Sequence, residues 1–328
     1  MAANTTDTQT RSNGRPAVLP GGRPAVLAGT QPRRSATAGE AVLAYLRFQA
    51  HTLASLEPRV RADEFDSVHQ MRVATRRLRA ALRSFGDVIP RQATGYLYGE
   101  LQWLGRALGA ARDADVLAGH LRDSLRPTPP ELLIGPVRAR VQGHYAPRRA
   151  AARTDLLEVL YSPRYATLLA ELDRVAAGPA LGPRAGEPAR DVLPAGVRRA
   201  CRQAQRRMRR ARHTRPGEAR DVALHQARKS ARRARYAAEA ATPVIGKQAR
   251  RFARQMKKVQ SVLGDHQDSV LARQAARDLG ISAHLAGENA FSYGLLYGHD
   301  ACDGERLQAQ AWRTWDRASR PRYQNWMH

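Results

Sequence analysis

The sequence of 328 residues predicts an all-α protein made of two similar halves. No segment shows the period-two alternation of apolar and polar residues that is typical of β-strands. Hydrophobic residues make up 43% of the chain but aromatic residues only 6%. The core must therefore consist mainly of Leu, Ala and Val, which favours helix-on-helix packing. A basic segment near residue 69 also recurs near residue 225, which indicates an internal duplication.

The first basic segment, Val68 to Phe85, has two unlike faces when it is placed on a helix at about 100° per residue. One stripe is basic and comprises His69, Arg72, Arg76, Arg79 and Arg83, with Arg77 beside it. The opposite stripe is apolar and predicts the core face: Met71, Ala74, Leu78, Ala81, Leu82 and Phe85. No acidic residue occurs between His69 and Phe85, so the like charges have no internal partner. We expect an anionic group opposite this stripe.

The second basic segment, Leu224 to Tyr236, repeats the first with a shift of 156 positions. His225, Arg228, Arg232, Arg233 and Arg235 correspond to His69, Arg72, Arg76, Arg77 and Arg79. Lys229 joins this second basic stripe. We call the two segments the signature helices. Two copies with the same histidine and the same arginine spacing are a far more specific signal than one basic helix.

The order of elements predicts a tail, two helical halves and a linker. Residues 1–36, rich in Thr, Gly, Pro and Ser, are expected to be disordered. Residues 37–177 form the first half, 178–194 a Pro/Gly-rich linker and 195–320 the second half. The expected helices are 40–56, 66–85, 91–108, one opening at 112–117, 131–161, 163–176, 197–213, 224–236, 248–263 and one through 291–297 to about 320. Gly109 ends the third helix in this prediction, and Leu263-Gly264 repeats that feature with a shift of 155.

Further basic residues lie on the neighbouring predicted helices. Arg47 in the first half matches Arg202 in the second. Arg202 belongs to a stripe that also contains Arg206. Beyond the second signature helix, Arg250, Arg254 and Lys257 follow at i, i+4 and i+7, with Lys258 beside them. We include these residues in the predicted anion-binding set.

The charge balance favours a polyanionic partner. The chain has 55 basic and 29 acidic residues, a formal net charge of +26, and only four of the basic residues are lysines. Arginine forks match phosphate oxygens bidentately, whereas lysine acts as a point charge. Two cysteines, Cys201 and Cys302, are too few for a disulfide framework or a cysteine metal site. Without an apolar leader or a run of eighteen apolar residues, we expect a cytoplasmic protein that does not enter the membrane.

At these residues the sequence resembles the CHAD domain, the conserved histidine α-helical domain. The paired His-x-x-Arg-x-x-x-Arg-Arg-x-Arg helices and the Leu-Gly…Asp features downstream carry the resemblance, over about residues 37–318. It implies two pseudo-symmetric four-helix bundles whose basic helices face each other across a central cleft or pore. It also implies binding of inorganic polyphosphate and association with polyphosphate granules. Some members carry an additional triphosphate-tunnel domain, for which this chain has no room, so a stand-alone CHAD protein is expected.

The histidines and aspartates of the repeats have alternative interpretations. His69 and His225 can contact the anion, or bond to the backbone in a purely structural role. A metal site is disfavoured because arginines repel a cation and no Cys, Asp or Glu lies three or four residues further on. Asp113 and Asp268 are interpreted as helix N-caps or as partners of basic side chains rather than as catalytic groups. No metal and no cofactor are expected.

The predicted function is non-enzymatic binding of inorganic polyphosphate, for which phosphate or sulfate can stand in. Nucleic-acid or nucleoid binding is the first alternative. It is disfavoured because the basic stripes lack the interleaved aromatic platforms of single-strand binders, although a protein of this charge will bind nucleic acid weakly at low salt. A phosphohydrolase is the second alternative, disfavoured because no acidic metal-binding cluster accompanies the arginines.

Overall fold

The computed structural model describes residues 36–178 and 181–328, and over these ranges it contains helices and no strand. The prediction of a disordered tail concerns residues outside these ranges, apart from Ala36. The helices are α1 Ala38–Arg61, α2 Ser67–Ser84, α3 Arg91–Leu125, α4 Val137–Tyr161, α5 Pro163–Ala177, α6 Ala189–His213, α7 Glu218–Ile245, α8 Lys247–Leu285, α9 Phe291–Ala318 and α10 Pro321–Gln324. Short 3₁₀ turns occur at Pro130–Leu132 and Asn325–Met327. The all-α prediction is confirmed.

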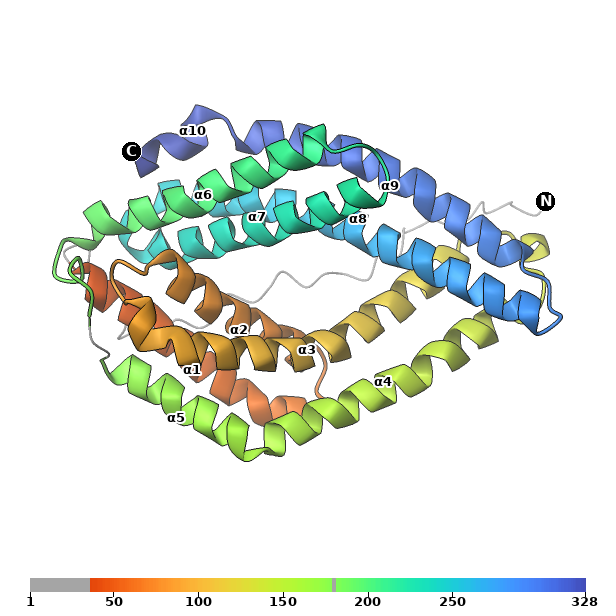
Figure 1. Cartoon of the computed structure of the whole chain (residues 1–328), viewed down its shortest axis with the longest axis horizontal. Coiled ribbons are helices and arrows are strands. Elements are labelled where there is room, and N and C mark those ends of the chain that lie inside the picture. Colours follow the sequence, from red (N-terminus) through yellow and green to blue (C-terminus); the bar gives the residue numbers. More distant parts are fainter. Residues whose placement is uncertain (1–35, 179–180) are drawn as a thin grey trace, which may run out of the picture. The chain divides into compact units, whose positions relative to one another are not determined.

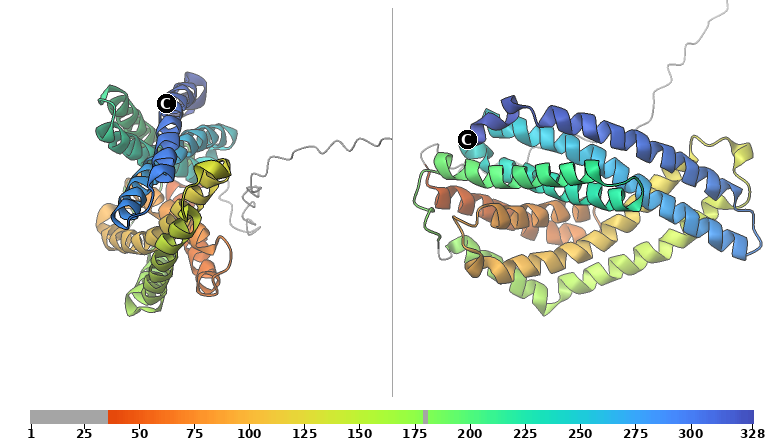
Figure 2. Two further views of the ribbon diagram at one scale, coloured as in Figure 1. Left: turned by 90° about the vertical axis from the view of Figure 1, so that its right-hand side faces the viewer. Right: turned by 45° about the horizontal axis from the view of Figure 1, so that its top comes forward.

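The helices pack in chain order within each half. Figure 1 shows α1 to α5 on one side and α6 to α9 on the other, and both views of Figure 2 agree. The signature helices α2 and α7 contact each other between the two halves, and α1–α6 and α3–α8 contacts flank them. The predicted core face of α2 is confirmed, because Met71, Ala74 and Leu78 are at most 1% exposed.

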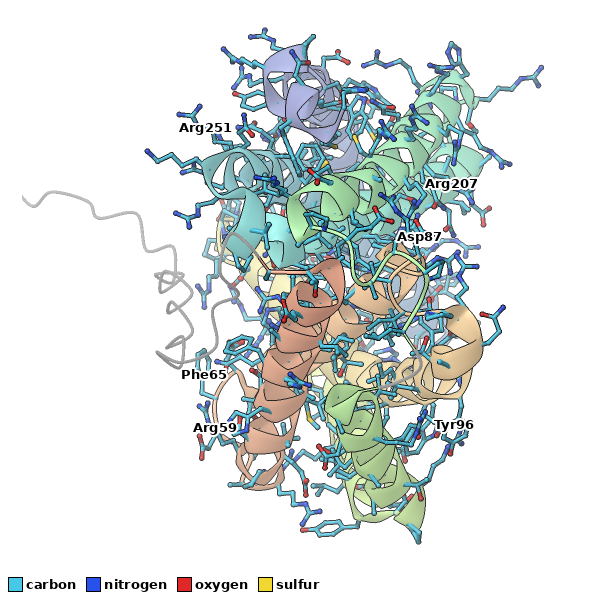
Figure 3. All side chains as sticks on the ribbon, turned by 90° about the vertical axis from the view of Figure 1, so that its left-hand side faces the viewer. Arg59, Phe65, Asp87, Tyr96, Arg207 and Arg251 are labelled. Carbon is cyan, nitrogen blue, oxygen red and sulfur yellow. The ribbon has the colours of Figure 1, made fainter. Side chains whose placement is uncertain are left out.

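One hydrophobic core runs through both halves, from Ala38 to Met327. A smaller core joins the end of α3, the start of α4, the last turns of α8 and the start of α9. Thr37 starts α1 with a capping box, since its hydroxyl accepts from the Glu40 amide and the Glu40 carboxylate accepts from the Thr37 amide. Arg199 of α6 pairs with Asp87, just after α2, at 2.7 Å, and Figure 3 labels Asp87 between the two halves.

Two predicted helix ends are wrong. α3 continues through Gly109 to Leu125, and α8 continues through Gly264 to Leu285. Glycine weakens a helix by only about 1 kcal/mol relative to alanine, which packing readily offsets. Both glycines are buried against an arginine of a signature helix. They therefore make room for a side chain.

The start of the second half also differs from the prediction. α6 begins at Ala189 rather than at Val197, so its first two turns occupy part of the expected 178–194 linker. Val192 and Leu193 are buried in the main core. A Cβ on Gly196 would lie 2.8 Å from the Phe85 ring, so the start of α6 packs closely on the end of α2. This packing overrides the helix-breaking tendency of Pro194.

The fourth predicted helix starts later than expected. Residues 131–136 form a 3₁₀ turn and a bend, and α4 begins only at Val137. Gly135 just before it adopts a positive φ of 80°, which favours glycine.

Candidate anion-binding site

The two signature helices bring their basic stripes together. Arg77 of α2 donates to the Glu239 carboxylate of α7 at 3.2 Å, which ties the two helices to each other. Along the same contact, the charge of Arg232 on α7 acts on Arg76 of α2 and lowers its pKa. Residues 156 positions apart in the sequence therefore act on one another in space.

Some signature arginines are neutralised by acids of the protein itself. Arg72 forms a bidentate pair with Asp113 of α3, at 2.9 and 3.4 Å. Glu239 serves two arginines, because it also accepts from Nε of Arg235 at 2.7 Å. Such arginines have their charge satisfied and act first as part of the scaffold.

Arg76 and Arg232 have no such partner. Neither forms a hydrogen bond or an ion pair with any residue in the described ranges. Burial and then the neighbouring Arg232 lower the pKa of Arg76 to about 9. Burial lowers the pKa of Arg232 to about 10, and Arg228, Arg72 and Arg79 add to that effect. Both guanidinium groups remain charged at neutral pH and lack a counter-charge, which is the requirement for an anion site.

Two more cations adjoin this pair. Burial, Arg232 and Arg76 lower the pKa of Lys229, so its ammonium lies in the same positive field. Arg228 packs its guanidinium onto Gly264 of α8, and its Nε is buried without a partner among the described residues. We call Arg76, Arg228, Lys229 and Arg232 the unpaired cluster.

Gly109 and Gly264, the two predicted helix ends, each pack against an arginine of a signature helix. A Cβ built on Gly109 would lie 3.7 Å from Nη2 of Arg72, and one on Gly264 would lie 3.0 Å from Nη2 of Arg228. Asp113 was predicted to be either an N-cap or the partner of a basic side chain, and its pair with Arg72 confirms the second role. Neither Asp113 nor Asp268 is an N-cap, because both lie inside continuous helices. Burial raises the pKa of Asp268, although the charge of Arg228 opposes this.

Replacing Gly264 with alanine is expected to weaken anion binding without destabilising the helix. The added Cβ must push the Arg228 guanidinium by a few tenths of an ångström, which costs about one hydrogen bond, or about fivefold in affinity. The substitution also improves helix propensity by up to about 1 kcal/mol. Gly109→Ala is the matched control, because its 3.7 Å contact is ordinary. Calorimetric titration and thermal denaturation of both variants test this, and an equal loss of affinity in both would contradict it.

The signature histidines occupy different surroundings. His69 lies exposed near the start of α2, whereas His225 is half-buried and lines a cavity of about 500 Å³ with Asp221, Arg273 and other residues. Partial desolvation of the ring lowers the pKa of His69, and Arg112, Arg72 and Arg76 add to that effect while Asp66 opposes it. Burial and Lys229 lower the pKa of His225. Both rings are therefore neutral at pH 7 in the free protein.

Anion affinity is expected to rise as the pH falls. A bound anion favours the protonated rings, so it raises the pKa values that the free protein holds below 6.5. Because folding lowers the pKa values of both histidines, the free protein loses stability as the pH falls below the pKa that these histidines have in the unfolded chain. Binding of the anion reverses this loss. Titrations between about pH 7.5 and pH 5.5 on the wild type and on His69→Gln/His225→Gln test this. If the affinity of the double variant depends on pH as that of the wild type does, the two histidines are not the cause of the pH dependence.

A second group of basic residues comprises Arg79 and Arg83 in the last turns of α2 and Arg233 in the middle of α7. Arg79 places its guanidinium 5.2 Å from the Tyr98 ring centre, and Arg83 donates to the Tyr98 hydroxyl at 3.4 Å. Arg233 bonds to Gln203 of α6. Burial lowers the pKa of Arg233 to about 10, and Arg83 is the next cause. This group extends the positive field of the unpaired cluster.

Several predicted site residues lie elsewhere. The Arg47 guanidinium donates to the carbonyl of Ala176 at 2.7 Å, which places it at the end of α5. Arg202 and Arg206 are exposed on α6. On α8, Lys257 and Arg250 lie about two and four turns before Gly264, on the stripe that faces α7. Arg254 and Lys258 instead line a separate cavity with Arg251, Gln255, Arg322 and Tyr323.

The sequence analysis did not identify the residues that bind some of the arginines and leave others free. Among these residues, Glu239 was the easiest to predict, because it follows Arg235 at i+4, a spacing that pairs opposite charges on a helix. Gln260 of α8, which accepts from Arg235 at 3.2 Å, and Tyr98 of α3 had no comparable signal.

The sequence pattern of the CHAD domain matches residues 44–277, most of the chain and all of the signature helices. The chain belongs to the CHAD domain family. The CHAD domain from the plant Ricinus communis has a crystal structure that is similar with a TM-score of 0.61 at 29% identity, covering 86% of this chain and 93% of that one. PptA from Streptomyces chartreusis has a similar fold, with a TM-score of 0.72 at 20% identity, covering 86% of this chain and all of that one.

Two longer proteins share its sequence. The uncharacterized proteins Rv2226 and MT2285 of Mycobacterium tuberculosis are each 38% identical over 265 residues, or 80% of this chain. The chain spans about half the length of these curated relatives. None of the helices in the described ranges is both long and apolar enough to cross a bilayer.

Proposed function

We propose that this CHAD protein binds inorganic polyphosphate between its signature helices, without turning it over, and that this binding associates it with polyphosphate granules. The family is linked to polyphosphate, and the chain belongs to it. The observation that supports the proposal most strongly is the unpaired cluster. None of its four cations forms a hydrogen bond or an ion pair with an acid among the described residues, although the charges of Arg228 and Asp268 interact, whereas Arg72, Arg77 and Arg235 are paired.

The chemistry of a phosphate chain suits this arrangement. Guanidinium groups one helical turn apart, about 5.4 Å, can engage successive phosphates of a flexible polyanion. The chain brings one or more charges per phosphate and needs no stacking partner. Tyr236, an aromatic residue beside the cluster, is buried, and the guanidinium groups of the protein's own Arg235 and Arg77 lie over its ring at 5.2 and 5.8 Å. A nucleobase therefore finds no free face on this ring.

The proposal fixes the expected salt dependence. The family resemblance carries over eight signature residues: His69, Arg72, Arg76, Arg79, His225, Arg228, Arg232 and Arg235. If each of them neutralised one phosphate, the slope of the logarithm of the binding constant against the logarithm of the salt concentration would be about −6. Pairing of Arg72 with Asp113 and of Arg235 with Glu239 removes two of them, and the neutral histidines remove two more at pH 7. With Lys229 added, about five remain, which lowers the slope to about −3.5.

A competition titration tests the proposed function. Labelled long-chain polyphosphate is bound at about 150 mM salt and challenged with single-stranded DNA, double-stranded DNA and RNA. The proposal predicts that none of the nucleic acids displaces polyphosphate at equal phosphate concentration. Equal competition by DNA or RNA would replace the proposal with nucleic-acid binding. Release of orthophosphate that requires a divalent metal would replace it with hydrolysis.

A further inference from the structure

A second cationic cavity lies on α8, away from the signature helices. Its volume is about 460 Å³, and its lining comes from α8 and from the C-terminal segment that packs against it. We call it the C-terminal pocket, and its lining residues are Arg251, Arg254, Gln255, Lys258, Arg322 and Tyr323. Arg251 and Arg322 belong to neither signature helix and to no stripe of the sequence analysis.

The pocket holds four cations and no acid. None of Arg251, Arg254, Lys258 and Arg322 forms an ion pair with a residue in the described part of the chain. Other surface arginines do pair, as Arg212 of α6 does with Asp316 of α9 at 2.9 Å. Arg251, Arg254 and Lys258 follow at i, i+3 and i+7 on one helix, where like charges repel one another. An anionic ligand removes this repulsion.

The C-terminal segment holds its part of the pocket in place. Trp326 packs edge-on against the buried Phe252 of α8, with ring centres 6.3 Å apart, and its Nε1 donates to the Tyr323 carbonyl at 2.9 Å. Gln324 bonds to Gln205 of α6 at 3.1 Å. These contacts fix Arg322 opposite the α8 cations, so the pocket is built by tertiary structure.

The pocket faces a different direction from the signature site. On α8, Gln260 and Gly264 contact arginines of α7, while Arg251 and Lys258 lie about 140° and about 120° around the same helix from Gly264, and Arg254 about 80°. Figure 3 shows Arg251 pointing outward from α8, on the other side of this half from Arg207 of α6. The pocket and the signature site therefore lie on different faces of α8.

We propose that the C-terminal pocket is a second binding site for condensed phosphate, so that one molecule holds two polymer segments at the same time. The inference rests on the proposed function of the signature site and extends it from binding to cross-linking. Two linked sites raise the avidity for a long chain and allow bridging between chains. Such bridging suits a protein that gathers polyphosphate into a dense body.

The pocket favours a bare phosphate chain over a nucleotide. Tyr323 is its one aromatic residue, and this ring packs on the main core with the Arg322 guanidinium 4.9 Å from its centre. A base would have to displace this arginine before it could stack. Four guanidinium or ammonium groups around 460 Å³ suit a short run of phosphates.

Calorimetric titration with inorganic tripolyphosphate, which is too short to reach both sites, tests the inference. The wild type is expected to bind about two ligands per chain. Arg251→Ala/Arg254→Ala/Lys258→Ala/Arg322→Ala is expected to bind about one, and so is the signature variant Arg76→Gln/Arg232→Gln. The control is Arg106→Ala/Arg148→Ala/Arg215→Ala/Arg313→Ala, which removes the same charge from exposed, scattered positions and should retain both sites.

The outcomes separate the two proposals. If the pocket variant still binds two ligands, or the signature variant binds none, there is no second site. If the signature variant keeps both while the pocket variant loses one, the pocket stands and the proposed function of the signature site fails. Light scattering with long-chain polyphosphate gives a second readout. The pocket variant should bind the polymer yet lose the large cross-linked particles that the wild type and the control form.

Discussion

Replacing Arg76 and Arg232 together with glutamine is expected to lower the affinity for long-chain polyphosphate by about 100-fold or more. Each guanidinium can form charge-assisted hydrogen bonds with phosphate that contribute about 1.5–3 kcal/mol. The same variant should be at least as stable as the wild type without ligand, because it removes two half-buried cations whose burial disfavours their charged form, and because the charge of Arg232 further lowers the pKa of Arg76. Calorimetric titration and thermal denaturation measure the two effects separately.

The opposite signs of the two effects make this variant informative. A residue that merely supports the fold loses binding and stability together. The matched control is Arg106→Gln/Arg215→Gln, which removes the same charge at exposed positions on α3 and before α7. It should change the affinity less than about tenfold, through the overall field alone. An equal loss in the control would show that net charge, and not the unpaired cluster, holds the polymer.

Replacing Glu239 with glutamine is expected to have the largest effect on stability. Its carboxylate accepts from Arg77 of α2 and from Arg235 of α7, and its side chain is only 23% exposed. Breaking a buried pair costs about 3–5 kcal/mol, and the partial exposure reduces this to about 2 kcal/mol here. The variant leaves two guanidinium groups without a counter-charge beside the already crowded cluster. Thermal and denaturant unfolding measure the loss.

Polyphosphate should restore the stability that this variant loses. A polyanion between α2 and α7 can neutralise Arg77 and Arg235 in place of the carboxylate, and a ligand that binds only the folded state stabilises it. Glu187→Gln is the control, because its pair with Arg184 is exposed and should contribute less than about 1 kcal/mol. If Glu239→Gln unfolds like this control, Glu239 does not hold the two halves together.

The position of each basic stripe could be predicted from the sequence, because helical periodicity separates it from an apolar stripe. Met71, Ala74 and Leu78 are buried as expected, and the duplication placed the second stripe correctly on α7. Local propensity failed at Gly109 and Gly264. A glycine at the end of an apolar pattern resembles a helix stop, and only the arginine that packs on it from another helix shows its role.

The division into paired and free arginines could not be predicted, because it depends on contacts between distant segments. Asp113 lies 41 residues after Arg72, and Glu239 lies 162 residues after Arg77. Arg254 follows Arg250 at i+4 and was predicted with it, yet it lines the C-terminal pocket together with Lys258, whereas Arg250 and Lys257 do not. Charge patterning shows where cations gather, and tertiary structure decides which of them remain available.

A crystal structure of the protein with a short condensed phosphate tests the central claim most directly. The account predicts a phosphate group whose oxygens lie within hydrogen-bond distance of both Arg76 and Arg232, with Arg72 still paired to Asp113 and Arg77 to Glu239. Phosphate found only elsewhere on the surface, with Arg76 and Arg232 without a ligand at saturating concentration, would contradict it.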